Sequence, residues 1–206
     1  MPSVLIADDH EIVRQGLRVI LEKELSSPIL GEAGNADEVL EQVVSGHWDL
    51  LLLDLSMPGR SGLEVLREVK ELRPHQKVLV VSMQPESHFA VRALKAGACG
   101  YVSKDSGREE LMRAIRLALT GRRYFSTELA SSIVEGGLDG LPHSSLSNRE
   151  YEIMCSLASG HGVGEIAAEL LISPKTVSTH RKRILVKMRM NSNADLTRYA
   201  MENGIL

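Results

Sequence analysis

The 206-residue sequence has only two cysteines, Cys99 and Cys155. Two cysteines make no disulfide framework, and neither has a neighbouring Cys or His at metal-ligand spacing, which favours a reducing compartment. No apolar run approaches the roughly 20 residues needed to span a membrane. The N-terminus turns acidic at Asp8, too early for the apolar core of a signal peptide. We therefore expect a cytoplasmic protein without membrane association.

The charge is small but unevenly distributed along the chain. The net charge is −3, yet residues 144–206 carry eight Lys and Arg against six Asp and Glu. Between Leu170 and Ala194 six basic residues occur and no acidic one. This asymmetry indicates two domains with different partners.

Short apolar runs and longer helical stretches alternate strictly over the first ~120 residues. Continuous apolar runs suit strands that are buried on both faces, and strict alternation with helices implies a parallel sheet. The sequence therefore predicts an α/β domain with a doubly wound, five-stranded parallel sheet. The expected strands are 4–7, 29–33, 50–55, 77–82 and 100–103, and the expected helices are 11–25, 36–45, 62–72, 86–96 and 107–120.

A second, all-α domain of four helices is predicted after a Gly-, Ser- and Pro-rich stretch at 135–146. Ser147 with Glu150, and Ser192 with Asp195, have the spacing of helix-capping boxes. Ser173 and Pro174 suit the start of another helix. We predict a first domain over 1–122, a linker over 123–145 in which 125–134 suits one short helix, and a helical domain over 146–206.

Five polar residues end or follow strands of the predicted sheet, and all should lie at its carboxyl edge, where open parallel sheets bind ligands. They are Asp8, Asp9, Asp54, Ser82 and Lys104. Clustered carboxylates repel one another unless a cation such as Mg²⁺ joins them. The edge therefore suits a metal and a phosphoryl group, with Asp54 as the nucleophile. Taken singly, Asp54 is more often a turn residue, and Asp8-Asp9 suits a helix start equally well.

The segments "ADDH", "LLLLDLSMPGRSG", "VVS" and "ALKAGACGYVSKD" resemble the receiver domain of bacterial response regulators, a flavodoxin-like fold. The resemblance implies that a sensor histidine kinase phosphorylates Asp54. The implied Mg²⁺ ligands are Asp8, Asp9, Asp54 and the backbone carbonyl of Ser56. The implied phosphoryl-sensing residues are Ser82, Tyr101 and Lys104, although Tyr101 also suits an ordinary core-edge position. Asp105 follows Lys104 where many receivers have proline, and the loop "MQPES" over 83–87 is divergent.

The stretch 172–188 predicts a basic helix that follows a short helix and a turn, as in a helix-turn-helix that reads the DNA major groove. Considered alone, such a helix is more often a solvated face. The region 144–206 resembles the DNA-binding domain of the NarL/LuxR class, and residues 191–204 match the helix that pairs two such domains on DNA. The resemblance assigns base contacts to Ser178, Thr179 and Lys182, and mainly phosphate contacts to Lys175, Thr176, Arg181 and Arg183. Gly162 and Gly164 depart from the pattern and predict a frayed start for the preceding helix.

These features together predict a DNA-binding transcriptional response regulator of a two-component system. The expected partners are a histidine kinase, double-stranded DNA, a second copy of the chain and RNA polymerase. We do not expect an enzyme, because an aspartyl-phosphate phosphatase needs a second acid two residues after its nucleophile, where this chain has Ser56. The other alternative is a phosphorylation-independent DNA-binding regulator with a structural receiver.

Overall fold

A computed structural model describes residues 1–58, 60–84, 86–126, 129 and 141–206 of the chain, without the side chains of residues 87 and 88. The chain divides into two compact units, Met1–Glu135 and Gly136–Leu206. The short helix predicted over 125–134 lies almost wholly outside the described residues. Of the helices that are described, none is long and apolar enough to cross a membrane.

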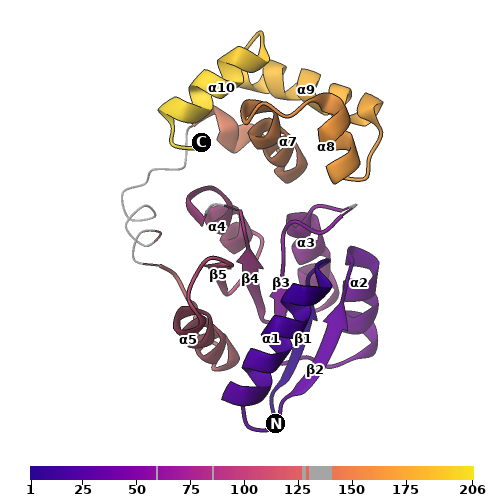
Figure 1. The fold of residues 1–206 in the computed structure, drawn as a ribbon, viewed down its shortest axis with the longest axis vertical. Helices are drawn as coiled ribbons and strands as arrows, with labels where there is room; N and C mark the ends of the chain where they lie inside the picture. The colour runs from indigo at the N-terminus through magenta and orange to yellow at the C-terminus, as the bar shows by residue number, and fades with distance from the viewer. Residues whose placement is uncertain (59, 85, 127–128, 130–140) are drawn as a thin grey trace. The chain divides into compact units, whose positions relative to one another are not determined.

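The first unit is the predicted five-stranded parallel sheet, in the order β2-β1-β3-β4-β5 (Figure 1). Its strands are β1 (Ser3–Ala7), β2 (Ile29–Ala33), β3 (Leu50–Leu53), β4 (Val78–Ser82) and β5 (Gly100–Ser103). The helices are α1 (Glu11–Glu24), α2 (Ala36–Ser45), α3 (Gly62–Leu72), α4 (Glu86–Lys95) and α5 (Arg108–Leu119). The predicted fold class is therefore confirmed. The third strand ends earlier than predicted, at Leu53, so Asp54 lies just beyond it.

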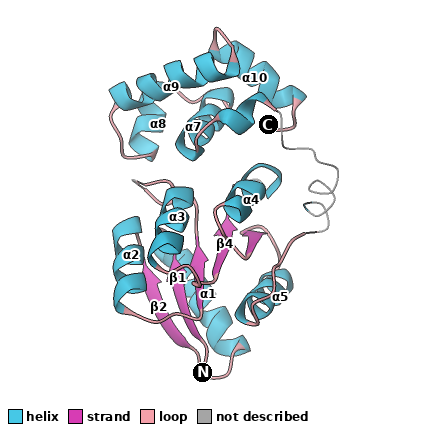
Figure 2. Cartoon of the chain, turned by 180° about the vertical axis from the view of Figure 1, so that it is seen from behind, coloured by secondary structure: helices cyan, strands magenta, loops and turns pink. Residues whose placement is uncertain are grey.

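Helices cover both faces of this sheet, which explains why its strands read as continuous apolar runs. Helices α1 and α5 pack on the face that carries Val4, Ile6 and Leu52, in one buried cluster. Helices α2, α3 and α4 cover the other face (Figures 1 and 2). All residues of β1, β3 and β4 are buried, whereas β2 is at the edge and only its last residue is buried.

Packing in the first unit continues past residue 122, the end that we predicted for its domain. Tyr124 is buried against the cluster under α1 and α5, and its backbone N–H donates to the Cys99 carbonyl at 3.0 Å. A Cβ atom on Gly100 would lie 2.8 Å from the Tyr124 carbonyl oxygen, so glycine allows this close approach.

The second unit is helical, as predicted. It contains a 3₁₀ helix, η1 (Pro142–Ser145), and the α-helices α7 (Asn148–Ala158), α8 (Val163–Glu169), α9 (Pro174–Met188) and α10 (Asn193–Glu202). The Ser147 and Ser192 side chains accept backbone hydrogen bonds as the predicted capping boxes require. The η1 helix was not predicted. Its His143 is buried, with Nδ1 2.8 Å from the Tyr199 hydroxyl, so this part of the predicted linker packs with the second unit.

Two details of the second unit differ from what the sequence suggested. Helix α8 begins at Val163, and the Glu165 carboxylate accepts the Gly162 N–H at 2.7 Å, which caps a turn that has no N-cap hydroxyl. Its fraying stays a prediction. In α9, Val177, Ile184 and Met188 are buried, but Val186, whose residue type suits the apolar side, is 70% exposed.

Candidate functional site

Parallel pairing brings the predicted acidic residues together at the carboxyl edge of the sheet. Ala7 and Leu53 are register partners, and the next residue continues the ladder: the Asp54 N–H donates to the Ala7 carbonyl at 2.9 Å. The Lys104 N–H likewise donates to the Ser82 carbonyl at 2.9 Å. Strands β1 and β3 flank the point at which the strand order reverses, where ligands bind in sheets of this kind.

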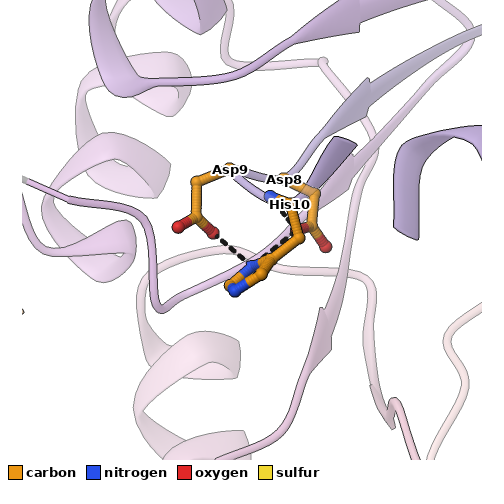
Figure 3. Close-up of side chains that lie close together, drawn as sticks. All are labelled: Asp8, Asp9 and His10. Atoms are coloured by element: carbon orange, nitrogen blue, oxygen red, sulfur yellow. Dashed lines mark hydrogen bonds and ion pairs between the residues drawn. The ribbon is translucent and has the colours of Figure 1, made fainter. Parts of the chain in front are cut away.

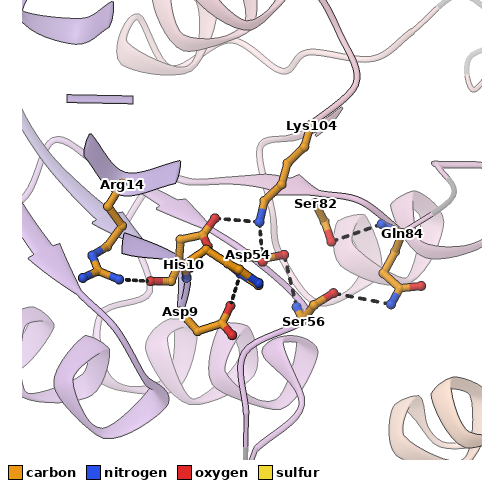
Figure 4. A network of polar contacts seen from close by, with 9 residues as sticks. Asp9, His10, Arg14, Asp54, Ser56, Ser82, Gln84 and Lys104 are labelled. Atoms are coloured by element: carbon orange, nitrogen blue, oxygen red, sulfur yellow. Dashed lines mark hydrogen bonds and ion pairs between the residues drawn. The ribbon is translucent and has the colours of Figure 1, made fainter. Parts of the chain in front are cut away.

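Lys104 joins the two most buried carboxylates of this edge (Figure 4). Its Nζ lies 2.6 Å from Asp8 Oδ2 and 2.6 Å from Asp54 Oδ2. The two carboxylate side chains are only 2% and 1% exposed. Burial alone would lower the pKa of Lys104, but the hydrogen bonds from its ammonium to Asp54 and Asp8 outweigh burial and raise that pKa. The ammonium therefore compensates charges that would otherwise be costly to bury.

His10 lies in a cluster of possible metal ligands with Asp8 and Asp9 (Figure 3). Its Nδ1 lies 2.9 Å from Asp9 Oδ1, and its backbone N–H donates to Asp8 Oδ1 at 2.9 Å. One possible ligand atom from each of the three residues lies within 4.8 Å of the others. Sequence reasoning missed His10, although its position directly after two carboxylates was a signal.

The donor set fits a hard divalent cation. Asp9 Oδ1 is buried, and apart from His10 Nδ1 at 2.9 Å it has no polar partner within the described part of the chain. Carboxylate oxygens are the ligands that Mg²⁺ prefers. Ser56, whose carbonyl is the fourth expected ligand, donates its N–H to Asp54 Oδ1 at 3.1 Å, so the chain turns back beside Asp54. The Mg²⁺ site itself stays a prediction.

The predicted sensing residues Ser82 and Tyr101 meet at the loop that follows β4. Both are fully buried. The Gln84 N–H donates to Ser82 Oγ at 3.3 Å, and the Tyr101 hydroxyl donates to the Gln84 carbonyl at 2.7 Å. Burial raises the pKa of Tyr101 above its ordinary value, so the hydroxyl keeps its proton as a donor. Tyr101 thus points inward in this structure.

Gln84 also links this loop to the loop that follows β3. Its Nε2 lies 3.4 Å from Ser56 Oγ, where it donates a long hydrogen bond (Figure 4). The sequence showed only that 83–87 is divergent, and it contained no sign that Gln84 would contact both Ser56 and Tyr101.

Arg14 supports the cluster of possible metal ligands from α1. Its Nη1 donates to the Asp8 carbonyl at 2.8 Å, and its Nε donates to Glu32 Oε2 at 3.2 Å. Hydrogen bonds from Arg18 and Arg14 lower the pKa of Glu32 against the effect of burial. This network holds the turn after β1 to the neighbouring strand β2, and sequence reasoning did not find it.

In the second unit, α9 presents most of the predicted DNA-contacting residues to solvent. Lys175, Thr176, Ser178, Thr179, Lys182 and Arg183 are exposed. Lys175, Thr179, Lys182 and Val186 follow one another at spacings of four, three and four residues, so they share the middle of one helix face. Arg181 is half-buried, and its Nε donates to Asn193 Oδ1 of α10 at 2.7 Å.

Family models match both units of the chain. Residues 4–116 match the model "Response regulator receiver domain". Residues 144–200 match the model "Bacterial regulatory proteins, luxR family". The first match covers the acidic edge of the sheet, and the second covers most of the four helices of the second unit.

Similar proteins match the chain over its whole length. The response regulator UvrY of Escherichia coli (strain K12) is 34% identical, over 100% of this chain and 96% of its own. The response regulator GacA of Pseudomonas aeruginosa is 35% identical, over 100% and 98%. A solved structure of RcsB from Salmonella enterica serovar Typhimurium, bound to promoter rprA in the presence of phosphomimetic BeF₃⁻, has a TM-score of 0.67 at 28% identity and covers 97% of this chain and 98% of its own. The similarity therefore covers both domains, in the same order along the chain.

Proposed function

Because the chain belongs to the response regulators that join a receiver domain to a LuxR-type DNA-binding domain, we propose that it is a cytoplasmic transcription regulator switched by phosphorylation of Asp54. This family membership confirms that the first part of the sequence resembles a receiver domain and the second part a LuxR-type DNA-binding domain. The observation that carries the proposal is the contact of one ammonium, Lys104, with both Asp8 and Asp54 at 2.6 Å. That arrangement binds cations and phosphoryl oxygens in one place.

The phosphorylation step uses groups that the structure has already positioned. An Asp54 carboxylate oxygen attacks the phosphorus of a phosphohistidine on a sensor kinase, an O–P bond forms and the P–N bond breaks. Asp8, Asp9, Asp54 and the Ser56 carbonyl would hold Mg²⁺, which neutralises negative charge around the transferred group. Lys104 then pairs with a phosphoryl oxygen in place of the free carboxylates.

The response spreads from Asp54 through the loop after β4. The Ser82 hydroxyl, which now accepts the Gln84 N–H, turns to donate to a phosphoryl oxygen. Gln84 is also bonded to Tyr101 and Ser56, so its displacement changes the packing of this loop and of α4. Phosphorylation thereby shifts the population toward a dimeric, DNA-binding state.

The α9 helix is the proposed DNA-reading element. Ser178, Thr179 and Lys182 contact bases, while Lys175, Thr176, Arg181 and Arg183 contact phosphates or neighbouring bases. Helix α10 pairs two copies, so the bound half-sites lie about one helical turn, roughly 10 bp, apart. A structure with two RcsB dimers bound to DNA, which covers 97% of this chain at 26% identity, supports a dimer. RNA polymerase is the proposed further partner.

Turnover of an external phosphorylated substrate is not part of the proposal. A phosphatase that uses an aspartyl-phosphate needs an acid two residues after its nucleophile, and this chain has Ser56 there. The relatives named above are response regulators.

A DNA-binding measurement tests the proposed function. The probe is a duplex that the full-length protein selects from a random-sequence pool. Affinity should rise when a small phosphodonor and Mg²⁺ are added, and this rise should vanish in Asp54→Asn. Equal binding in all four conditions would favour the phosphorylation-independent regulator with a structural receiver.

A further inference from the structure

The basic residues of the second unit fall into two groups according to whether they have a partner. Four are engaged: Arg149 with Glu152, Arg181 with Asn193, Lys187 with Glu150, and Arg198 with Asp195. The other four are exposed, and none of their side chains makes an ion pair or hydrogen bond within the described residues. They are Lys175, Lys182, Arg183 and Arg189. The first three are the exposed cations of the α9 face, and the fourth, Arg189, has no role assigned so far.

Arg189 occupies a backbone position that favours glycine. It is the first residue after α9, with a φ of 55° and a ψ of 43°. The Met190 N–H donates to the Leu185 carbonyl at 2.9 Å and the Arg189 N–H donates to the Val186 carbonyl at 3.1 Å, which is the Schellman pattern. A side chain at positive φ is strained, because its Cβ crowds the backbone.

The other helix ends of this unit provide a direct comparison. Helices α7 and α10 end in the same hydrogen-bond pattern, but there the residue at positive φ is Gly160 and Gly204, respectively. Helix α8 ends in this pattern with Leu171 at positive φ, so two of the three other α-helices described in this unit use glycine there and one does not. At the end of α9 the chain instead has a long cation whose side chain forms no ion pair or hydrogen bond within the described residues that could offset the strain.

The carboxylates that line a surface hollow together with Arg189 do not pair with it. Asp195 and Glu202 line the same surface hollow as Arg189, yet neither forms an ion pair with it. Asp195 Oδ2 already accepts the N–H groups of Asn191 and Ser192, and its Oδ1 pairs with Arg198. The guanidinium of Arg189 is therefore available to an external anion.

The length of α9 indicates which part of the DNA would supply this anion. Lys175 and Arg189 are 14 residues apart, which is about 21 Å along a helix. The major groove is about 12 Å wide. If the first turns of α9 contact bases, its far end reaches the sugar–phosphate backbone that flanks the groove. A guanidinium binds phosphate oxygens there in bidentate fashion.

We propose that Arg189 is a DNA-phosphate contact at the end of the recognition helix, and that this contact accounts for a long cation at a backbone position that favours glycine. The proposal rests on the proposed function, because it requires the second unit to bind DNA. It adds to the footprint a phosphate contact that the sequence pattern did not predict.

The salt dependence of DNA binding tests this directly. The full-length protein, treated with a small phosphodonor and Mg²⁺, is titrated with a DNA duplex of about three helical turns over a series of salt concentrations. Each lost phosphate contact reduces the slope of log K against log salt by about 0.9. Arg189→Gly should show that reduction, and Arg189→Lys should retain the wild-type slope. Arg198→Gln is the matched control, because it removes an exposed arginine that is already paired, and it should also retain the slope.

Thermal unfolding separates a DNA contact from a structural role. Glycine relieves the positive φ, so Arg189→Gly should unfold at the wild-type temperature or above it. A wild-type slope in Arg189→Gly would overturn the proposal. If the unfolding temperature of that variant also fell, the role of Arg189 would be structural.

The same titration distinguishes this failure from failure of the proposed function. If Arg183→Ala reduces the slope and Arg189→Gly does not, only the role of Arg189 is refuted. If the wild-type protein shows no salt-dependent binding at all, both proposals are refuted.

Discussion

The Lys104 ammonium lies 2.6 Å from Asp54 Oδ2, so the proposed phosphoacceptor is ion-paired before any phosphoryl group arrives. The same ammonium lies 2.6 Å from Asp8 Oδ2. Lys104 therefore places one positive charge between two buried carboxylates.

This contact predicts an unusual response to Mg²⁺. Lys104→Met leaves Asp8 and Asp54 buried without their partner, which should lower the free energy of unfolding by about 3–5 kcal/mol without metal. Saturating Mg²⁺ should stabilise this variant more than the wild type, in which the ion competes with Lys104. Denaturant unfolding with and without Mg²⁺ measures both effects. Lys23→Met, which removes an exposed lysine of α1, should behave like the wild type. Equal stabilisation by Mg²⁺ in Lys104→Met and wild type would contradict this interpretation.

The second unit should lose stability in acid through Glu150. This side chain is almost fully buried, and its Oε2 lies 2.6 Å from Lys187 Nζ. Burial alone would raise the pKa of Glu150, but bonds from Lys187 and Ser147 outweigh it and hold that pKa below the ordinary 4.5. The folded state therefore binds this proton less readily than the unfolded state. The resulting stabilisation is complete above the ordinary value and is lost as the pH falls through the lower, folded value.

Glu150→Gln should remove this part of the pH dependence. The measurement is the unfolding midpoint between neutral pH and about pH 3, a range that spans ordinary carboxyl titration. Lys187→Met removes the main charge partner and should flatten the same part of the profile. A Glu150→Gln profile parallel to the wild-type profile would show that the pair does not supply this stability.

Leu171 predicts a stabilising substitution at the turn before α9. It is 68% exposed and has a φ of 49°, and the Ile172 N–H bonds the Ala167 carbonyl at 3.0 Å in a Schellman turn. Leu171→Gly should raise the free energy of unfolding by up to about 1 kcal/mol, because the relief of strain exceeds the entropy cost of glycine. Leu171→Ala keeps the Cβ and should bring no gain. Chemical denaturation of the three proteins decides the matter, and equal stability of the Gly and Ala variants would argue against strain at this residue.

The sheet and the meeting of Asp8, Asp54 and Lys104 were predictable because parallel strands share a carboxyl edge. A residue that directly follows a buried strand is placed by the ladder, as the Asp54–Ala7 backbone hydrogen bond shows. The periodicity of apolar residues and the pairing of parallel strands thus allow the sequence to predict which residues far apart in the chain lie close together.

The missed residues act through side-chain contacts that have no period. Gln84 reaches Ser56 from a different loop, and Arg181 reaches Asn193 across a helix boundary. Val186 is apolar by residue type, but the helix geometry places it on the exposed face. The positive φ of Arg189 follows from the hydrogen bonds that end α9. An arginine does not predict this backbone conformation, which is more typical of glycine.

The most direct test of the account is the intact mass of the protein after incubation with a small phosphodonor and Mg²⁺, with Asp54→Asn as the control. The account predicts a single phosphoryl adduct on the wild-type protein and none on the variant. An adduct that persists in Asp54→Asn would contradict the assignment of Asp54 as the phosphoacceptor. The same holds if the wild-type protein carries no adduct after incubation with a competent sensor kinase.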